Sequence, residues 1–369
     1  LLYRINNWTF FAKMKSIIFV IHGIAGGGAE RVASLLINEW VRLKYNVLLI
    51  TFSPLEENDY FISPLVSRRF IINNYNFNFF FISKIISNIA RVFKLRKIIR
   101  REKNSVVISF ITRTNIEVII ATLGLGNKII ISERNDVYSQ RNHWSRFERF
   151  MRIVFYRFSS KVTSNILSSL KYMEKYVPRE KLVFIPNPVT IQKVVSTIDS
   201  NIILTVGRLV YQKNHRELIT AISKIKIQTK GWSVNILGDG PLRDDLEQHI
   251  ISHNLSDMVT LHHTVSDINP YYFSAGIFVL TSHYEGMPNV LFEAMAHKIP
   301  CIVPNNLSGA LYFVEDNVTG LIYKAGDTTD LANKINMLID DNDLRIHIGN
   351  MSYKKLNHLT IDKIINRWS

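Results

Sequence analysis

Two cations lie close together in the chain, directly after a short apolar run. Arg208 and Lys213 belong to the stretch Gly-Arg-Leu-Val-Tyr-Gln-Lys-Asn, and residues 202–206 before it are rich in Ile and Val. Arg grips a phosphate with two parallel hydrogen bonds, and Lys adds a mobile point charge. Together they could neutralise a departing diphosphate without a metal ion. On this stretch alone, two solvated surface cations remain the alternative.

Two carboxylates, Glu285 and Glu293, follow the most hydrophobic run of the C-terminal half, residues 277–281. Glu285 falls in a predicted loop and can point into a cleft. Pro288 or Asn289 opens a predicted helix whose free N–H groups can hold a phosphate. Glu293 lies about one turn into that helix, where its two oxygens could accept hydrogen bonds from vicinal hydroxyls, as on a ribose. The alternative makes Glu285 a helix cap and Glu293 solvated, although the apolar neighbours of Glu293 indicate a partner.

Two glycine-containing stretches also follow predicted strands. Residues 23–31 follow the run 16–22, and their glycines let backbone N–H groups approach a ligand at a helix N-terminus. They form neither Gly-x-Gly-x-x-Gly nor Gly-Lys-Ser/Thr, which disfavours a nicotinamide site and a phosphate-loop nucleotidase. Gly238-Asp-Gly-Pro241 follows the run 233–237 and is typical of a turn before a helix. Either stretch could be no more than a tight strand-to-helix turn.

The elements that must position these residues follow from a repeated pattern. Apolar runs rich in Ile and Val alternate with segments of helical periodicity, which predicts buried parallel sheets. The pattern breaks at Pro186 and Pro188. We therefore expect two α/β domains, residues 14–190 and 191–352, and a terminal helix over 353–369. The predicted strands are 16–21, 47–52, 106–110, 128–132, 182–185, 202–206, 233–237, 259–261, 277–281 and 300–303.

Length and composition describe a folded chain. The 369 residues are 47% hydrophobic and 20% charged, enough to bury a full core. No apolar run reaches the length of a membrane-spanning helix. Residues 1–13 lack signal-peptide features, so we expect an upstream extension before Met14. The single cysteine, Cys301, excludes an intrachain disulfide and a thiolate metal cluster, and it fits a reducing cytosol.

The charge is concentrated in the N-terminal half. Residues 1–190 carry a net charge of +17 and residues 191–369 a net charge of −2. Such a surface attracts a polyanion, for example an anionic bilayer or a phosphorylated substrate. Two segments, 81–101 and 141–161, resemble surface-seeking amphipathic helices, although ordinary packing on a sheet is the alternative. The first places Ile82, Ile85, Ile86, Ile89 and Phe93 on one face, and the second interleaves Arg141, Arg146, Arg149, Arg152 and Arg157 with Trp144, Phe147, Phe150 and Phe155.

Several motifs, in this order and near this spacing, resemble one enzyme family. They are Gly-Arg-Leu-x-x-Gln-Lys, Gly-Asp-Gly-Pro and Glu-Gly-Met-Pro-Asn-x-x-x-Glu. They are similar to those of the retaining nucleotide-sugar glycosyltransferases of family 4. Gly-Gly-Ala-Glu-Arg near the start resembles the same family, and Ile131-Ser-Glu-Arg-Asn-Asp136 resembles its bacterial surface-polysaccharide branch. The resemblance implies the GT-B architecture, in which two Rossmann-like domains face a cleft and a C-terminal helix crosses back to the N-terminal domain.

The resemblance also implies a role for each matching residue. Arg208 and Lys213 would hold the diphosphate, Glu285 would contact the donor sugar, and Glu293 would bind the ribose. Further donor contacts would come from Gly27, Gly28, Gly238, Gly286, Met287, Pro288 and Asn289. The chain departs from the family where many members carry a His near the donor sugar. Here Glu133, Arg134 and Asn135 follow the strand, so they become the candidates on the acceptor side.

The expected reaction follows from these roles. A hexose or N-acetylhexosamine would move, with retention and without a metal, from a UDP-linked donor. The acceptor would be a polyprenyl-diphosphate-linked sugar or an oligosaccharide in capsule, O-antigen or exopolysaccharide synthesis. The enzyme would work in the cytoplasm at the anionic inner face of the cell membrane. The alternatives are a sugar-nucleotide epimerase of the same architecture, a catalytically dead scaffold, or a basic protein that binds membranes or nucleic acid. Nucleic acid is disfavoured because no binding motif is present.

Overall fold

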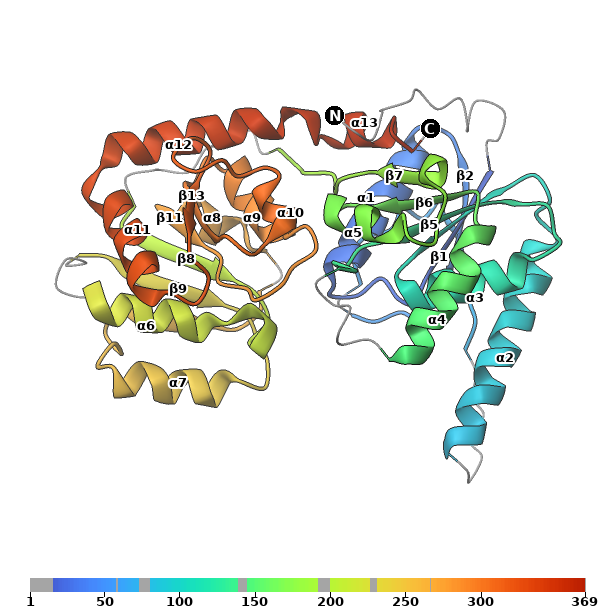
Figure 1. The fold of residues 1–369 in the computed structure, drawn as a ribbon, viewed down its shortest axis with the longest axis horizontal. Helices are drawn as coiled ribbons and strands as arrows, with labels where there is room; N and C mark the ends of the chain where they lie inside the picture. Colours follow the sequence, from blue (N-terminus) through green and yellow to red (C-terminus); the bar gives the residue numbers. More distant parts are fainter. Residues whose placement is uncertain are drawn as a thin grey trace. The chain divides into compact units, whose positions relative to one another are not determined.

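The computed structural model of the chain describes residues 16–57, 59–72, 80–138, 145–191, 200–225, 231–265 and 267–368. The chain forms two compact units (Figure 1). Unit 1 comprises Leu1–Pro188 and Ile361–Ser369, and unit 2 comprises Val189–Thr360. The predicted domain boundaries lie at 190/191 and 352/353. The first is close to the observed boundary after Pro188, and the second is earlier than the observed boundary after Thr360. The predicted extension, residues 1–13, lies outside the described residues.

Unit 1 is built on a parallel sheet whose strands run in the order β3-β2-β1-β4-β5-β6-β7. Buried runs of Ile, Val and Phe form the central strands, as expected for a sheet covered on both faces. The edge strand β3 and the short β6 were not predicted. The strands are β1 (Ser16–Ile21), β2 (Asn46–Thr51), β3 (Ser67–Phe70), β4 (Val106–Phe110), β5 (Lys128–Glu133), β6 (Lys161–Ser164) and β7 (Leu182–Phe184).

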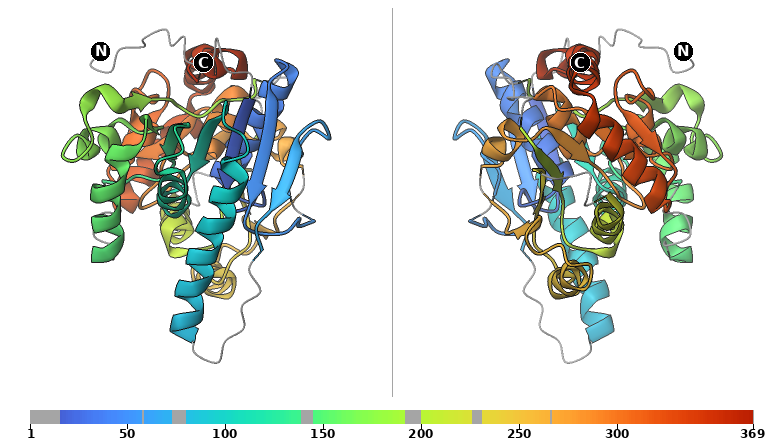
Figure 2. Two further views of the ribbon diagram at one scale, coloured as in Figure 1. Left: turned by 90° about the vertical axis from the view of Figure 1, so that its right-hand side faces the viewer. Right: turned by 90° about the vertical axis from the view of Figure 1, so that its left-hand side faces the viewer.

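The helices of unit 1 lie on both faces of this sheet. Figure 2 shows α2 beside α3, with the first turns of α2 extending beyond the sheet. The short α13 packs on α1 within the same unit. The helices are α1 (Gly28–Arg42), α2 (Phe80–Ile99), α3 (Thr112–Thr122), α4 (Arg146–Phe155), α5 (Leu167–Met173) and α13 (Ile361–Ile365).

Unit 2 repeats the architecture with strands in the order β10-β9-β8-β11-β12-β13, all parallel. The short β13 was not predicted. Its strands are β8 (Ile202–Val206), β9 (Ser233–Leu237), β10 (Val259–His262), β11 (Ile277–Val279), β12 (Cys301–Pro304) and β13 (Leu321–Tyr323). Its helices are α6 (His215–Ile225), α7 (Arg243–Ser252), α8 (Asn269–Phe273), α9 (Asn289–Ala296), α10 (Ser308–Leu311), α11 (Thr328–Asp340) and α12 (Asn342–Lys355). The predicted class, α/β with two parallel sheets, is confirmed.

The C-terminal segment differs from its prediction. Residues 353–369 were expected to form one helix, but α12 ends at Lys355 and a 3₁₀ turn follows over Leu356–His358. Leu359 still belongs to unit 2, where its carbonyl oxygen accepts a hydrogen bond from the Val189 amide at 2.7 Å. The chain re-enters unit 1 at Ile361. The break separates a helix of unit 2 from a helix of unit 1.

Each sheet has one position where the strand order reverses direction. In unit 1 this position lies between β1 and β4, and in unit 2 between β8 and β11. At such a switch point the connections on either side leave toward opposite faces and open a crevice at the carboxyl ends of the strands. The loops that follow these four strands are therefore the places to look for a site.

The two segments predicted to be amphipathic are only partly as expected. In α2 the side chains of Ile86, Ile89 and Phe93 are exposed, Phe93 by 68%. In α4 the side chains of Phe147 and Phe150 are 69% and 59% exposed. However, Arg152 is buried, so it does not belong to a solvated basic face. The side chains of Ile82 and Ile85, together with Arg141 and Trp144, lie outside the described residues.

Candidate functional site

The switch point of unit 2 brings two of the predicted donor-binding side chains into contact. Lys213 lies in the 3₁₀ turn that follows β8, and Glu285 lies in the loop that follows β11. The Lys213 ammonium donates a short hydrogen bond to Glu285 Oε1. The two side chains are only 15% and 11% exposed. The sequence motifs assigned these residues to different parts of the donor, and the structure joins them in one ion pair.

Neighbouring polar side chains hold this pair in place. Gln212 Nε2 donates to the Tyr284 carbonyl oxygen at 2.8 Å, and the His283 amide donates to the Gln212 carbonyl oxygen at 2.8 Å. Ser282 Oγ donates to Glu285 Oε1 at 2.9 Å. These bonds join the loop after β8 to the loop after β11. They therefore hold Lys213 and Glu285 close to each other.

The Gly-Asp-Gly-Pro stretch supports the Arg208 loop by close backbone contact. At Gly238, with φ of 151°, a Cβ atom would lie 2.0 Å from the Gly207 carbonyl oxygen. At Gly240 it would lie 2.4 Å from the Leu209 carbonyl oxygen. The Leu209 amide donates to the Asp239 carbonyl oxygen at 2.8 Å. Two glycines are needed here because any side chain would push the two loops apart.

Asp239 in the same stretch is occupied by its own neighbours. It accepts hydrogen bonds from the Thr264 amide at 2.7 Å, from His263 Nδ1 at 2.6 Å and from the Arg243 guanidinium at 3.1 Å. These bonds, that of the Thr264 amide first, hold the pKa of the Asp239 carboxyl well below its usual range. The carboxylate therefore fixes the loop.

Arg208 is exposed, and a histidine that the motifs did not single out lies beside its loop. His215, in the first turn of α6, is 3% exposed. Its Nε2 lies 3.3 Å from the Gly207 carbonyl oxygen. Burial, and then the Lys213 charge, lowers the pKa of His215 to about 4. The neutral His215 ring can therefore orient the Arg208 loop without adding charge. In the sequence, the only feature that marks His215 is its position two residues after Lys213.

Glu293 has the partner that its apolar neighbours indicated. The Tyr272 hydroxyl donates to Glu293 Oε2 at 3.0 Å. Glu293 lies in the second turn of α9, which begins at Asn289. Met287 and Pro288, which precede α9, are buried. Gly286 is packed tightly, since a Cβ atom on Gly309 of α10 would lie 1.8 Å from the Gly286 carbonyl oxygen.

Two features flank the switch point of unit 1. They are the loop with Gly27 and Gly28 after β1, and Ile111 after β4. Gly27 caps α1 without a side chain, and Gly28 is the first residue of the helix. A Cβ atom on Gly27 would lie 1.9 Å from Glu30 Oε2, so a carboxylate already packs on this helix start. After β4, Ile111 has φ of 75°, which is rare for a β-branched residue. Such strain is often found at ligand sites.

Two arginines that the motifs missed lie near this position. The Arg91 guanidinium donates to Glu117 Oε1 at 2.8 Å and to Asn88 Oδ1 at 2.6 Å. Arg113 donates to the same Asn88 oxygen at 2.8 Å. Burial and the charges of Arg91 and Arg113 lower the pKa of His22, which follows β1. Their sequence positions, within helices, carried no recognisable pattern.

The candidates for the acceptor side are mostly buried. Glu133 is fully buried and accepts hydrogen bonds from Thr112 Oγ1 at 2.9 and 3.0 Å and a short one from the Tyr156 hydroxyl. Arg152 Nε lies 3.5 Å from the same carboxylate. These partners occupy Glu133, so the structure does not support its direct contact with an acceptor.

Arg134 is buried as well, and only Asn135 of the three is exposed. The Arg134 guanidinium donates to Asn187 Oδ1 at 2.9 Å. It lies over the Phe110 ring at 4.2 Å and over the Trp368 ring at 5.5 Å. Burial lowers the pKa of Arg134 to about 9. The side chain joins three segments of unit 1 and acts in its core.

The described residues contain no group of three or more His, Cys, Asp and Glu side chains that could hold a metal ion. Asp341 caps α12 by accepting a hydrogen bond from the Leu344 amide at 2.8 Å. Among the residues that the structure describes, no helix is both long and apolar enough to cross a membrane.

Comparison with known proteins decides the family. The model described as glycosyl transferases group 1 matches residues 188–355, and that described as Glycosyltransferase Family 4 matches residues 26–193. A relative from Campylobacter jejuni is 31% identical, with 96% of this chain and 97% of the relative covered. The chain belongs to the family 4 glycosyltransferases, which have the GT-B architecture. The predicted resemblance is confirmed.

The same comparisons give names and folds of other members. The Campylobacter jejuni relative is named as an α-1,4-N-acetyl-D-galactosaminyltransferase acting on a GalNAc-GalNAc-diNAcBac-PP-undecaprenol. An Escherichia coli relative, 25% identical over 77% of this chain and 79% of its own, is named as a UDP-Gal:α-D-GlcNAc-diphosphoundecaprenol α-1,3-galactosyltransferase. The structure of Anabaena Alr3699/HepE in complex with UDP superposes with a TM-score of 0.79 at 18% identity, covering 95% of this chain and 97% of that one. At that identity the likeness shows the fold.

Proposed function

We propose that this glycosyltransferase moves a hexose or N-acetylhexosamine from a UDP-sugar to a lipid-linked acceptor, with retention of configuration, in bacterial surface-glycan synthesis. The observation that carries the donor part is the Lys213–Glu285 ion pair at the switch point of unit 2. It provides a cation for a diphosphate and a carboxylate for sugar hydroxyls within one short contact. The exposed Arg208 guanidinium follows the neighbouring strand.

The leaving group sets the role of each side chain. When the bond between the anomeric carbon and the diphosphate breaks, negative charge develops on the diphosphate oxygens. Arg208, Lys213 and the N–H groups at the start of α9 would take up that charge. Glu285 would hold the sugar hydroxyls, while Glu293, already oriented by Tyr272, would accept from the ribose hydroxyls. The acceptor hydroxyl would attack the face that the diphosphate leaves.

Two relatives support a lipid-linked acceptor. The names of the Campylobacter jejuni and Escherichia coli enzymes both specify a sugar on a diphosphate-linked undecaprenol. The exposed aromatic side chains of α4 and the positive charge of residues 1–190 suit an enzyme that works at an anionic membrane surface. We therefore place its work at the cytoplasmic face of the cell membrane.

Ligand-induced thermal stabilisation tests the donor. The full chain would be heated with UDP, GDP, ADP, NAD or UDP-sugars in the presence of a chelator. A ligand at about 100 times its dissociation constant adds about 2.7 kcal/mol of stability. We expect stabilisation by UDP and one UDP-sugar and none by NAD. If only GDP or only ADP stabilises the chain, that nucleotide and not UDP is the carrier of the donor sugar.

Two variants test the residues. Lys213→Ala and Glu285→Gln should each lower transfer at least about 100-fold, as the loss of a preorganised electrostatic contact does. Lys224→Ala on α6 and Glu247→Gln on α7 are matched controls away from the switch point. Normal turnover in either site variant would refute its assignment.

Metal independence is tested in the same assay. We expect full transfer in excess chelator because Arg208 and Lys213 would supply the positive charge. Loss of activity in chelator and its recovery with Mg²⁺ would contradict this part of the proposal. An epimerase would interconvert UDP-sugars without any acceptor, and the absence of such interconversion separates the two activities.

A further inference from the structure

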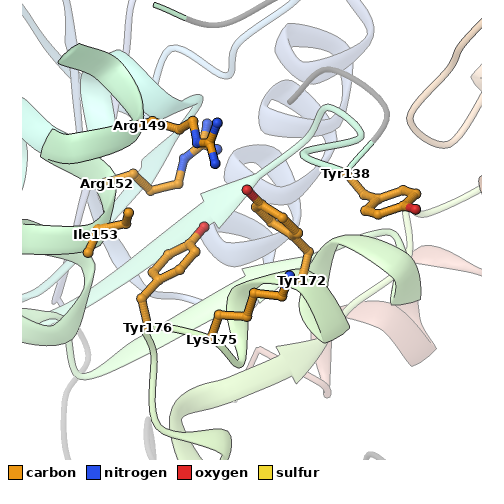
Figure 3. Close-up of a pocket in the computed structure, with 7 residues that line it drawn as sticks. All are labelled: Tyr138, Arg149, Arg152, Ile153, Tyr172, Lys175 and Tyr176. Atoms are coloured by element: carbon orange, nitrogen blue, oxygen red, sulfur yellow. The ribbon is translucent and has the colours of Figure 1, made fainter. Parts of the chain in front are cut away.

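A cavity lies in unit 1, and its lining residues lie outside the switch-point loops. Its volume is about 550 Å³, within the range of pockets that hold small molecules. It lies between α4 and the end of α5, and Tyr138 completes its wall. Figure 3 shows the Tyr172 and Tyr176 hydroxyls pointing toward the Arg149 and Arg152 guanidinium groups. The lining residues are Tyr138, Arg149, Arg152, Ile153, Tyr172, Lys175 and Tyr176.

The polar side of the cavity is rich in hydrogen-bond donors. Arg152 is buried, its guanidinium donates a hydrogen bond to Thr112 Oγ1 at 3.1 Å, and its Nε lies 3.5 Å from the Glu133 carboxylate. Lys175 Nζ lies 5.1 Å from the centre of the Tyr172 ring. Burial raises the pKa of Tyr176 above its usual value, so its hydroxyl keeps the proton that it can donate. Donors of this kind on several sides suit the oxygens of a phosphoryl group.

Arg152 is paired with Glu133, but the nearby carboxylates do not neutralise Arg149 or Lys175. Glu148 is engaged in the capping box of α4, where it accepts from the Ser145 amide at 3.2 Å. Glu174 pairs with Arg179 at 3.8 Å. Among the described residues, no carboxylate lies within salt-bridge distance of Arg149 or Lys175. Two positive charges at the cavity are thus left for a ligand.

The apolar side of the cavity continues onto the surface of α4. Ile153 lines the cavity and is 39% exposed. Phe150 and Phe147 precede it at three-residue spacing, so all three share one side of the helix. Both rings are more than half exposed. A phosphate ion alone would leave most of this volume empty and would not use the apolar stripe.

We propose that this cavity binds the phosphoryl headgroup of an anionic membrane phospholipid, while Phe147, Phe150 and Ile153 enter the lipid interface beside it. The inference rests on the proposed work of the enzyme at a membrane and names the lipid component that holds unit 1 there. Binding of the headgroup requires neither the donor nor the acceptor, because every residue that lines the cavity lies outside the switch-point loops.

Vesicle binding of the full-length protein tests this site. Flotation with phosphatidylcholine vesicles that contain phosphatidylglycerol would be measured for wild type and for Arg149→Gln/Lys175→Gln. The matched control, Arg146→Gln/Lys171→Gln, removes the same charge from exposed positions on α4 and α5 that do not line the cavity. Each charge near an anionic surface accounts for about a fivefold change in partitioning. We expect the cavity pair to lose at least about tenfold more than the control.

Tyr176→Phe removes a hydroxyl without changing charge, and we expect it to weaken binding to the same vesicles. Equal losses in the two charge pairs, or no change in Tyr176→Phe, would reduce the effect to general surface attraction and overturn the proposal. So would the absence of binding to any vesicle.

A competition experiment shows whether the cavity binds a lipid headgroup or a soluble phosphate. Short-chain dihexanoylphosphatidylglycerol should displace the vesicles, whereas inorganic phosphate at equal concentration should not. Displacement by inorganic phosphate would assign the cavity to a soluble phosphate instead. Stabilisation by UDP and transfer from the UDP-sugar are measured in parallel, so failure of the proposed function and failure of this site give different results.

Discussion

At the residue scale, the Lys213–Glu285 pair predicts energetic coupling between two donor-binding groups. Removing one partner leaves the other charge unpaired and mostly buried, whereas removing both avoids that cost. We expect Lys213→Met and Glu285→Gln to be non-additive, with a coupling free energy of about 0.5–3 kcal/mol. Hydrogen exchange in unit 2 would measure it.

The control for this cycle is the exposed Arg216–Asp245 pair in the same unit. Its coupling should stay below about 1 kcal/mol. Additive effects of the two site variants would mean that the pair contributes nothing beyond its separate charges.

His215 gives a second prediction at this scale, on pH. Its pKa is about 4 in the folded chain against an ordinary value of 6.5. Between these values the unfolded chain binds a proton that the folded chain does not, so stability falls as the pH drops from 6.5 toward 4. The loss amounts to about 3 kcal/mol at most. His215→Gln should remove this part of the pH dependence.

Thermal unfolding between pH 7.5 and pH 4 would measure the effect of His215→Gln. His347→Gln, at an exposed position of α12, is the control and should keep the pH dependence of the wild type. An unchanged pH dependence in His215→Gln would show that His215 is not held neutral.

At the scale of elements, the sequence predicted what depends on local pattern. Long buried strands such as β1 and β4 were visible because parallel strands covered on both faces are continuous runs of Ile and Val. The strands β3 and β6 were missed because their sequences, Ser-Arg-Arg-Phe and Lys-Val-Thr-Ser, each contain a single apolar residue. The three residues of β13, Leu-Ile-Tyr, were missed although they are apolar. Their pairing depends on neighbours that the local sequence does not contain.

The same distinction applies to the site. Motif spacing placed Lys213 and Glu285 at strand ends, but their contact depends on a strand order that brings β8 beside β11. The burial of Glu133 was not visible in the sequence for the same reason. A carboxylate after a strand has the pattern of a ligand-binding residue, and its partners Thr112 and Tyr156 lie more than 20 residues away on either side.

The contact between the Gly238 loop and the Gly207 loop leads to a prediction for elements. Gly238→Ala places a Cβ atom 2.0 Å from the Gly207 carbonyl oxygen. The overlap should cost about 1–3 kcal/mol beyond backbone strain and should weaken UDP binding by displacing Arg208. Gly326→Ala is the control, since φ there is 83° but no atom lies within 4 Å of its Cβ. That change should cost only about 1–2 kcal/mol and leave UDP affinity intact. Equal UDP affinity in both variants would contradict the supporting role of Gly238.

At the scale of the whole molecule, the chain leaves unit 1 at Pro188 and returns at Ile361, after all of unit 2. The returning segment supplies part of the core. The Trp368 ring is 1% exposed and stacks on Phe110 at a centroid distance of 5.9 Å. It also meets the edge of Trp40 at 6.1 Å and lies beneath Arg134. Unit 1 therefore completes its core only when the last residues of the chain are present.

This dependence gives the last prediction. Trp368→Ala removes a buried ring from a packed aromatic cluster and should destabilise unit 1 by about 3–5 kcal/mol. Because the cluster belongs wholly to unit 1, hydrogen exchange should accelerate in β1 and β4 and stay unchanged in β8 and β9. Asn366→Ala, at an exposed position in the same segment, should change stability by less than about 0.5 kcal/mol. If both units were destabilised equally, they would unfold as one cooperative body, and Trp368 would stabilise the whole chain.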